Sequence, residues 1–281
     1  MNNLRYDEIH YWSEIKLDIL REYANAYSRI LSSQRDPSLY HIYIDAFAGA
    51  GRHISKTTGG FIPGSPANAL LIDPPFREYH FIDLDAQKID ALEQLSGKRK
   101  GVYIYRGDCN EILLKEIFHR ARFCEYKRAL CVLDPYGLHL DWKIMYTAGT
   151  MRSIEIFLNF PVADMNRNVL WRSPDDVQQA QIERMNKFWG DESWREAAYK
   201  VSPQRPLWGE ERKVKTNNDQ VVKAFQQRLK KVAGFNYVPD PLPMKNSNNA
   251  VVYYLFFASH KPAAEKIVKA IFNKYANYKV S

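Results

Sequence analysis

The stretch His41-Ile42-Tyr43-Ile44-Asp45-Ala46-Phe47-Ala48-Gly49-Ala50-Gly51 decides the fold. A short β-branched and aromatic run ends at an aspartate, and a turn with two spaced glycines follows at once. Glycine removes the side chain that would block a close approach, and it permits backbone angles that other residues avoid. The pattern predicts a buried strand that ends at a ligand, with Asp45 in the crevice beyond the carboxyl end of an open α/β sheet.

The spacing of the glycines separates the ligands that such turns commonly bind. A dinucleotide site needs G-x-G-x-x-G, but here the third position falls on Ile54. A P-loop needs G-x-x-x-x-G-K-[ST], and no lysine follows in that register. The motif that the sequence does contain is D-x-F-x-G-x-G. The alternative to a ligand site is an ordinary strand–turn–helix in which the glycines are incidental.

Length and composition restrict the class of protein. The chain has 281 residues, 46% hydrophobic and 26% charged, which allows one large core or one core with a sizeable insertion. The first residues lack the apolar segment of a signal peptide, and the longest apolar run, 250–258, is too short to span a bilayer. Cys109, Cys124 and Cys131 have no metal-ligand spacing, and their odd number suits reduced thiols. We therefore expect a cytoplasmic protein with no membrane segment and no metal site.

The net charge of +8 is unevenly distributed along the chain. Residues 1–160 contain 20 basic and 20 acidic residues, whereas residues 161–281 contain 20 basic and 12 acidic ones. We therefore expect an anionic partner such as nucleic acid to meet the C-terminal part. The alternative is a solvated basic surface with no partner.

Strands and helices are predicted to alternate over the first 160 residues. An amphipathic helix over 12–32 precedes the first strand. Residues 52–64 are expected to form a mobile polar loop, and Ser65 to cap a short helix over 67–72. The five predicted strands are 40–44, 79–83, 102–105, 129–133 and 154–159.

Three acidic residues, Asp45, Asp83 and Asp108, are predicted at the ends of three consecutive strands. Because the carboxyl ends of parallel strands meet at one edge of a sheet, their carboxylates should converge there. Asp83 is placed to accept hydrogen bonds from the two ribose hydroxyls of an adenosyl ligand. Asp108 is placed to accept one from the exocyclic amine of its adenine. The alternative role for Asp108 is to cap the helix that follows and runs to Arg122.

The alternation is interrupted after residue 160. We expect an inserted helical substrate lobe over 161–234, with helices at about 173–188, 192–200 and 219–232 and a loop containing Pro203, Pro206 and Trp208. Residues 235–281 should complete the core of 1–160 with strands at 235–238 and 250–258 and a helix over 262–275. A short connection makes that last strand pair antiparallel. The predicted fold is therefore α/β: a Rossmann-like class I methyltransferase sheet of seven strands, the last one antiparallel, with an inserted helical lobe.

Together these motifs resemble the three-Cys-motif partner proteins, the TcmP family, over most of the chain. The resemblance is carried by 43–51, Gly64-Ser65-Pro66, 81–85, Gly107-Asp108-Cys109-Asn110, 133–137, 160–162, 166–168 and 253–258, and it is weakest in 170–235. It implies a fold that binds S-adenosylmethionine (SAM) and a three-Cys-motif protein as partner, from a radical-SAM-like or phage-derived group. It supplies no substrate.

Similarity to class I methyltransferases assigns roles to individual residues. Asp45 and the turn at Gly49 and Gly51 would hold the methionine part of SAM, Asp83 the ribose and Asp108 the adenine amine. The full set of residues expected at the cofactor is Asp45, Phe47, Gly49, Gly51, Asp83, Asp85, Asp108 and Cys109.

Asp134-Pro135-Tyr136 lies where amino-methyltransferases of nucleic acid carry D-P-P-[YF], which makes these residues the catalytic candidates. The aromatic residue comes one place early, and Gly137 follows it. Gly137, Asn166 and Arg167 are candidates for substrate binding, and a hydrogen-bonded turn is the alternative for the last two. The functional hypothesis is methylation of an exocyclic amine such as adenine N6. The alternatives are a non-catalytic SAM-binding partner or sensor, and a nucleic-acid-binding protein with a vestigial fold.

Overall fold

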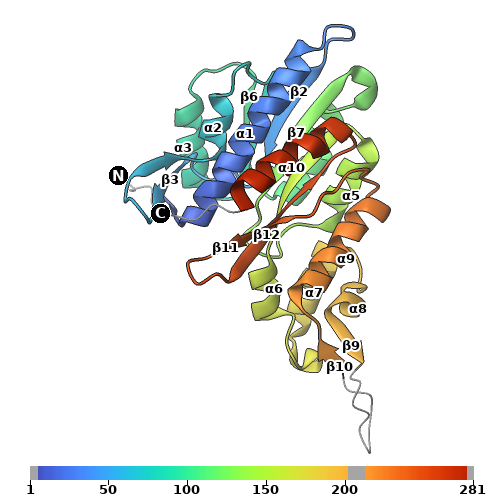
Figure 1. Ribbon diagram of the computed structural model, residues 1–281. Coiled ribbons are helices and arrows are strands. Elements are labelled where there is room, and N and C mark those ends of the chain that lie inside the picture. The colour runs from blue at the N-terminus through green and yellow to red at the C-terminus, as the bar shows by residue number, and fades with distance from the viewer. Residues whose placement is uncertain (1–5, 202–212, 277–281) are drawn as a thin grey trace, which may run out of the picture.

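The computed structural model describes residues 6–201 and 213–276, and within these ranges seven strands form one central sheet in the order β11-β12-β8-β7-β2-β5-β6 (Figure 1). In that order they are Leu242–Lys245, Val251–Ala258, Ile154–Phe160, Lys127–Leu133, Tyr40–Asp45, Glu78–Asp83 and Val102–Arg106. β12 pairs antiparallel with both of its neighbours, and the other pairs in this described sheet are parallel. The predicted sheet with its reversed last strand is confirmed, and this is the class I methyltransferase layout.

One face of the sheet is covered by α1 (Tyr11–Ser33), α2 (Ser65–Leu70), α3 (Ala86–Ser96) and α10 (Pro262–Ala276). The predicted helices over 12–32 and 262–275 are therefore confirmed. α1 and α10 lie side by side across this face (Figure 1). The helical spacing of the apolar residues in α1 explains this packing, because Ile19 and Tyr23 are buried against the sheet.

On the other face, the predicted helix after Asp108 is less regular than expected. It consists of α4 (Cys109–Ile112), a π-helical segment (Leu113–Ile117) and a 3₁₀ turn (Phe118–Arg120), and a further 3₁₀ turn (Phe123–Glu125) precedes β7. The change of helix type coincides with complete burial of Leu113, Ile117 and Phe118, so tertiary packing decides the local geometry. α5 (Trp142–Met151) covers the adjoining part of this face.

The inserted segment contains helices and also a small antiparallel strand pair. Its elements are α6 (Val162–Asn168), a 3₁₀ turn (Pro174–Asp176), α7 (Gln179–Trp189), α8 (Trp194–Ala198), β9 (Tyr199–Val201), β10 (Lys213–Lys215) and α9 (Asn218–Lys231). The helix expected from residue 173 begins only at Gln179, and the helix expected to reach residue 200 gives way to β9. The strand pairing between β9 and β10 joins residues that local sequence patterns do not connect. Pro203, Pro206 and Trp208 lie outside the described residues.

The inserted helices share one apolar core with the sheet. Phe225 of α9 is fully buried, and its ring centroid lies 4.7 Å from that of Phe160 on β8 and 5.5 Å from that of Phe256 on β12. Phe188 and Trp189 of α7 contact the same ring, at 5.6 and 5.3 Å. Aromatic packing of this kind makes the segment part of the fold rather than an appendage.

The expectation of a mobile loop over 52–64 is wrong. β3 (Arg52–Ser55) and β4 (Phe61–Pro63) form a hairpin, and β1 (Glu8–Ile9) pairs parallel with β3. The Ser55 hydroxyl also donates to Glu14 Oε1 of α1 at 2.6 Å. The partners that order this segment lie some forty residues earlier in the chain, and its polar, glycine-rich composition gives no sign of them.

Two further boundaries differ from the sequence-based expectations. The residue that caps α2 is Gly64, with no side-chain bond, so Ser65 is the first helical residue instead of the cap. The sixth strand is β11 and not 235–238, where Tyr237 forms only an isolated bridge to Ser259. β11 contains Pro243, which argues against a strand by local rules, but β11 is an edge strand, where a missing backbone donor is tolerated.

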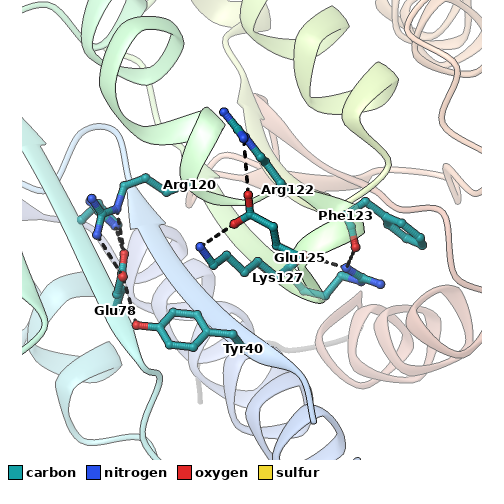
Figure 2. A network of polar contacts seen from close by, with 9 residues as sticks. Tyr40, Glu78, Arg120, Arg122, Phe123, Glu125 and Lys127 are labelled. Atoms are coloured by element: carbon teal, nitrogen blue, oxygen red, sulfur yellow. Dashed lines mark hydrogen bonds and ion pairs between the residues drawn. The ribbon is translucent and has the colours of Figure 1, made fainter. Parts of the chain in front are cut away.

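A polar network fixes the amino-terminal edge of the sheet (Figure 2). The carboxylate of Glu78 accepts two hydrogen bonds from Arg120, at 2.9 and 3.0 Å, and one from the Tyr40 hydroxyl at 3.0 Å. It also contacts His80 Nε2 at 3.0 Å. Burial opposes ionisation of Glu78, but the hydrogen bonds from these partners lower its pKa to about 2. The network ties the segment after α4 to β2 and β5, and it leaves the opposite, carboxyl edge for the site.

If the insertion and the sheet share one core, replacing Phe225→Ala should destabilise the whole protein. We expect the free energy of unfolding to fall by about 3–5 kcal/mol, because a fully buried ring is lost and a cavity remains. Chemical denaturation should show one transition for both variant and wild type. Phe61→Ala, at an exposed ring, is the matched control and should change stability by about 0.5 kcal/mol or less. A loss below about 1 kcal/mol in Phe225→Ala would contradict the shared core.

Candidate functional site

A cavity of about 400 Å³ lies at the carboxyl edge of β2, β5 and β6. Six of the residues predicted at the cofactor or in the catalytic motif line it: Phe47, Asp83, Asp85, Asp108, Cys109 and Tyr136. The remaining lining residues are Ala46, Leu84, Gly107, Asn110 and His139. The sheet brings these residues together because β2, β5 and β6 are successive parallel strands that end at the same edge.

The glycine turn after β2 is held by Asp83. Asp83 Oδ2 accepts a hydrogen bond from the Gly49 amide at 2.9 Å, and its Oδ1 accepts one from the Asp85 amide at 2.9 Å. Gly49 and Gly51 have φ of +64° and +75°, which favour glycine. A Cβ at Gly51 would also lie 2.4 Å from Leu95 Cδ2 of α3. The backbone conformation therefore favours glycine at both positions of this turn.

Asp45 is completely buried and does not line the cavity that Asp83 and Asp108 share. Its Oδ1 accepts a hydrogen bond from the Phe47 amide at 3.3 Å, and its Oδ2 has no hydrogen-bond partner among the residues that the structure describes. Burial raises the pKa of Asp45 to about 7. Only two of the three predicted acids thus meet at the cavity, and the third lies behind the turn.

Asp108 caps the helix that follows it and also lines the cavity, whereas its role toward an adenine amine stays a prediction. Its Oδ1 accepts a hydrogen bond from the Asn110 amide at 2.9 Å, which caps α4, and its side chain also lines the cavity. Asn110 Nδ2 bridges Asp108 Oδ1 and the His139 carbonyl, both at 3.0 Å. Burial raises the pKa of the Cys109 thiol to about 12, and nearby Asp108 adds to the rise, so this residue contributes a neutral surface.

Asp134 at the end of β7 is already engaged on both carboxylate oxygens. Lys16 Nζ of α1 forms an ion pair with its Oδ2, and Asn159 Nδ2 of β8 donates to its Oδ1 at 2.7 Å. Lys16 is only 8% exposed, so its charge must be compensated where it lies. The sequence analysis missed both partners. A lysine among the apolar residues of α1 was the available signal for Lys16.

Tyr136 is exposed beside the cavity and contacts two residues from elsewhere in the chain. Its hydroxyl lies 3.3 Å from Asp7 Oδ2 and 3.4 Å from Lys88 Nζ, and the Lys88 ammonium lies 5.5 Å from its ring centroid. Lys88 also pairs with Asp7 at 2.7 Å. Residues near the N-terminus are thereby joined to the cavity rim through Tyr136, which sequence patterns did not indicate.

None of the three predicted substrate-binding residues lines this cavity in the part of the chain that the structure describes. Gly137 has φ of +121° and lies against Asp164, whose Oδ2 would be 2.7 Å from an added Cβ. Asn166 donates to Asn218 Oδ1 at 3.0 Å and accepts from Lys215 at 2.8 Å, which ties α6 to α9 and β10. Arg167 is exposed, and its carbonyl accepts from Trp171 Nε1 at 2.7 Å. Asn166 and Arg167 lie on helix α6 and not in the hydrogen-bonded turn that was the alternative for them, and the substrate role of all three residues stays a prediction.

Comparison with known proteins extends the description of the fold. No family model matches the chain, and comparison with curated proteins finds no match, so the resemblance to the TcmP family stays a prediction. A solved protein of the family DUF519 from Legionella pneumophila str. Philadelphia 1 superposes with a TM-score of 0.52 at 13% identity, covering 93% of this chain and 92% of its own. At that identity the likeness shows the fold alone.

A second solved structure is the plantazolicin methyltransferase BamL in complex with a desmethyl analogue and SAH, at 11% identity, a TM-score of 0.37 and 89% coverage of each chain. That TM-score is too low to support an argument about this protein.

Among the residues that the structure describes, no helix combines the length and apolar character needed to cross a bilayer.

The raised pKa of Asp45 predicts a pH-dependent stability. The unfolded carboxyl ionises near 3.8 and the folded one near 7, so the free energy of unfolding should fall as pH rises between these values. Asp45→Asn should remove this pH-dependent contribution to the free energy of unfolding. At pH 8 the variant should be more stable than wild type by up to roughly 4 kcal/mol. Urea denaturation from pH 4 to 8 measures the difference.

Asp90→Asn, at an exposed carboxylate of α3, is the matched control and should follow wild type at every pH. Buried Glu155, whose pKa burial also raises to about 7, contributes equally to all three proteins and cancels in the comparison. If the free energy of unfolding depended on pH equally in Asp45→Asn and wild type, the raised pKa of Asp45 would be contradicted.

Proposed function

We propose that this chain is a SAM-dependent methyltransferase. The observation that carries the proposal is the cavity beyond β2, β5 and β6, lined by Asp83 and Asp108 next to a glycine turn that Asp83 holds. The fold is one that supports many chemistries, so the argument rests on these residues and not on the architecture.

The residues present fit an adenosyl cofactor. The volume of about 400 Å³ lies within the range of small-molecule pockets, roughly 300–1,000 Å³. Asp83 and Asp108 offer carboxylate acceptors for ribose hydroxyls and an adenine amine, and Phe47 offers an apolar surface. When bound, SAM supplies an electrophilic methyl group on a sulfonium.

Asp134 and Tyr136 are the groups that would orient an amine nucleophile. The Lys16 ammonium and the Asn159 amide fix the Asp134 carboxylate in one orientation. An ionised carboxylate has about four acceptor positions, so two remain for the hydrogens of a target amine. Held in this way, the nitrogen lone pair would face the cofactor, and the carboxylate would stabilise the positive charge that develops on nitrogen.

We infer an exocyclic amine in nucleic acid, such as adenine N6, as the substrate. Two features support it: the Asp134-Pro135-Tyr136 sequence and the excess of basic residues after position 160. The exposed ring of Tyr136 at the cavity rim is available to stack on a base that leaves its helix. The resemblance to the TcmP family adds a three-Cys-motif protein as a proposed partner.

Calorimetry with SAM and with S-adenosylhomocysteine (SAH) tests whether the protein binds this cofactor. Wild type should bind both, and Asp83→Ala should weaken binding by about 2–4 kcal/mol, or 30-fold or more, because charge-assisted bonds to the ribose and the anchor of the Gly49 amide are lost together. Asp90→Ala, on the outer face of α3, should bind as wild type does. No binding by wild type, or full affinity in Asp83→Ala, would refute the cofactor assignment.

A SAM-binding partner or sensor without turnover is the second candidate. The observation that favours it is that both oxygens of Asp134 already have partners within the protein. Transfer of labelled methyl from SAM to pools of RNA, DNA and protein separates the two.

If the chain is an enzyme, Asp134→Ala should lose at least about 100-fold in methyl transfer while its SAM affinity changes by less than threefold. Asp141→Ala, at another carboxylate after β7, is the matched control and should keep its turnover. Label that appears in no pool with wild type favours the sensor, and label confined to protein rules out base methylation.

A further inference from the structure

A second cavity, of about 250 Å³, lies at the opposite edge of the sheet from the proposed cofactor site. It is formed where the C-terminal half of α1 meets the start of α10, beside the first residues of β7 and β8. Figure 1 shows α1 and α10 side by side. Ile154, Leu31 and Ile267 are among the side chains that give it a mainly apolar wall.

Two hydroxyl groups in this wall are buried and unpaired. Tyr27 is 7% exposed and Ser153 is 2% exposed, and neither hydroxyl has a hydrogen-bond partner within residues 6–201 and 213–276. Buried polar groups are nearly always paired with protein, water or a ligand. The wall of this cavity therefore contains two residues whose hydroxyls have hydrogen-bonding capacity to spare.

The acid in the wall does not supply those partners. Glu155 is buried, and its two carboxylate oxygens accept hydrogen bonds from the hydroxyls of Tyr23 and Ser259. Its pKa is raised by burial to about 7, so its negative charge is reduced at neutral pH. Glu155 therefore does not satisfy the hydroxyls of Tyr27 and Ser153.

The charges around the cavity are mainly positive. Arg128, Arg152 and Lys261 all line it. The Arg128 guanidinium and the Lys261 ammonium lie 3.8 and 5.7 Å from the Phe123 ring centroid, and Arg128 Nη1 also donates to the carbonyls of Phe123 and Lys127. Phe123 lies on the 3₁₀ turn before β7 (Figure 2).

The start of α10 adds to this positive field. Pro262, Ala263 and Ala264 line the cavity. Pro262 has no N–H, so the amides of the first turn that carry partial positive charge beside the cavity are those of Ala263 and Ala264. Glu265, the acid of that first turn, is paired with Lys269 at 2.8 Å and does not line the cavity.

We propose that this cavity is a second ligand site, and that it binds a small carboxylate with an apolar, aromatic body. The carboxylate meets Arg128, Arg152, Lys261 and the first turn of α10, and the hydroxyls of Tyr27 and Ser153 donate to its oxygens. The ring fills the apolar part at Ile154 and Ile267. A cavity of about 150 Å³ accommodates benzene, so one of about 250 Å³ suits a ring with a short acidic chain.

Three probes of one shape and different charge test the proposal with the full chain: 3-phenylpropionate, 3-phenylpropan-1-ol and 3-phenylpropylamine. We expect calorimetry or ligand-observed NMR to show the carboxylate binding at least about tenfold more tightly than the alcohol, and the amine binding most weakly. Saturating SAH should leave this binding unchanged, because the two cavities lie at opposite edges of the sheet. No binding of the carboxylate at millimolar concentration, or equal affinity for the amine, would overturn the proposal.

Tyr27→Phe and Ser153→Ala separate a ligand site from a structural role. Neither hydroxyl has a partner in the described protein, so both variants should fold and melt at or above the wild-type temperature, yet each should bind 3-phenylpropionate about tenfold more weakly. Tyr126→Phe, at an exposed tyrosine outside the cavity, is the matched control and should bind as wild type does. Ile267→Trp should fill the cavity and abolish binding. Unchanged affinity in Tyr27→Phe and Ser153→Ala, or unchanged affinity in Ile267→Trp, would contradict the site.

Discussion

The hydrogen bond from the Gly49 amide to the Asp83 carboxylate connects the two strands on which the proposed cofactor site depends. It is available because β2 and β5 are parallel neighbours that end at the same edge of the sheet. The bond anchors the glycine turn that follows Phe47, and Phe47, Asp108 and Cys109 all line the cavity. Fold and site are thus coupled through one backbone amide and one side chain.

Compensation of buried charge is the second constraint on the molecule. Lys16 and Asp134 neutralise each other beneath the carboxyl edge, and Glu155 is satisfied by two hydroxyls near the opposite edge. Asp45 differs from both, because one of its oxygens has no partner in the described chain and burial raises its pKa to about 7. A buried acceptor without a donor is costly to the folded protein.

Much of the fold could be predicted from the sequence, because strands buried on both faces and amphipathic helices leave strong local patterns. The run ending at Asp45, the helix that became α1 and the reversed last strand are examples. The β1–β3–β4 pairing and β11 could not be found in that way. The first depends on a partner about forty residues distant, and Pro243 in the second is acceptable only because the strand lies at an edge.

The site was predicted in part for the same reason. Asp83 and Asp108 meet because strand ends converge, which sequence order reveals. Lys16, Asn159 and Lys88 come from elements whose placement against Asp134 and Tyr136 depends on tertiary packing. Asn166 was assigned to a substrate from its place after a strand, whereas its bonds to Asn218 and Lys215 join parts of the insertion.

The central claim is that the acids at the carboxyl edge enclose an adenosyl group. A crystal structure of the full chain with SAH at saturating concentration tests it most directly. The account predicts density for the nucleoside in the cavity between Phe47 and Tyr136, with the ribose hydroxyls within hydrogen-bond distance of Asp83 and the adenine amine near Asp108. Ordered SAH bound elsewhere, or an empty cavity at saturating SAH, would contradict it.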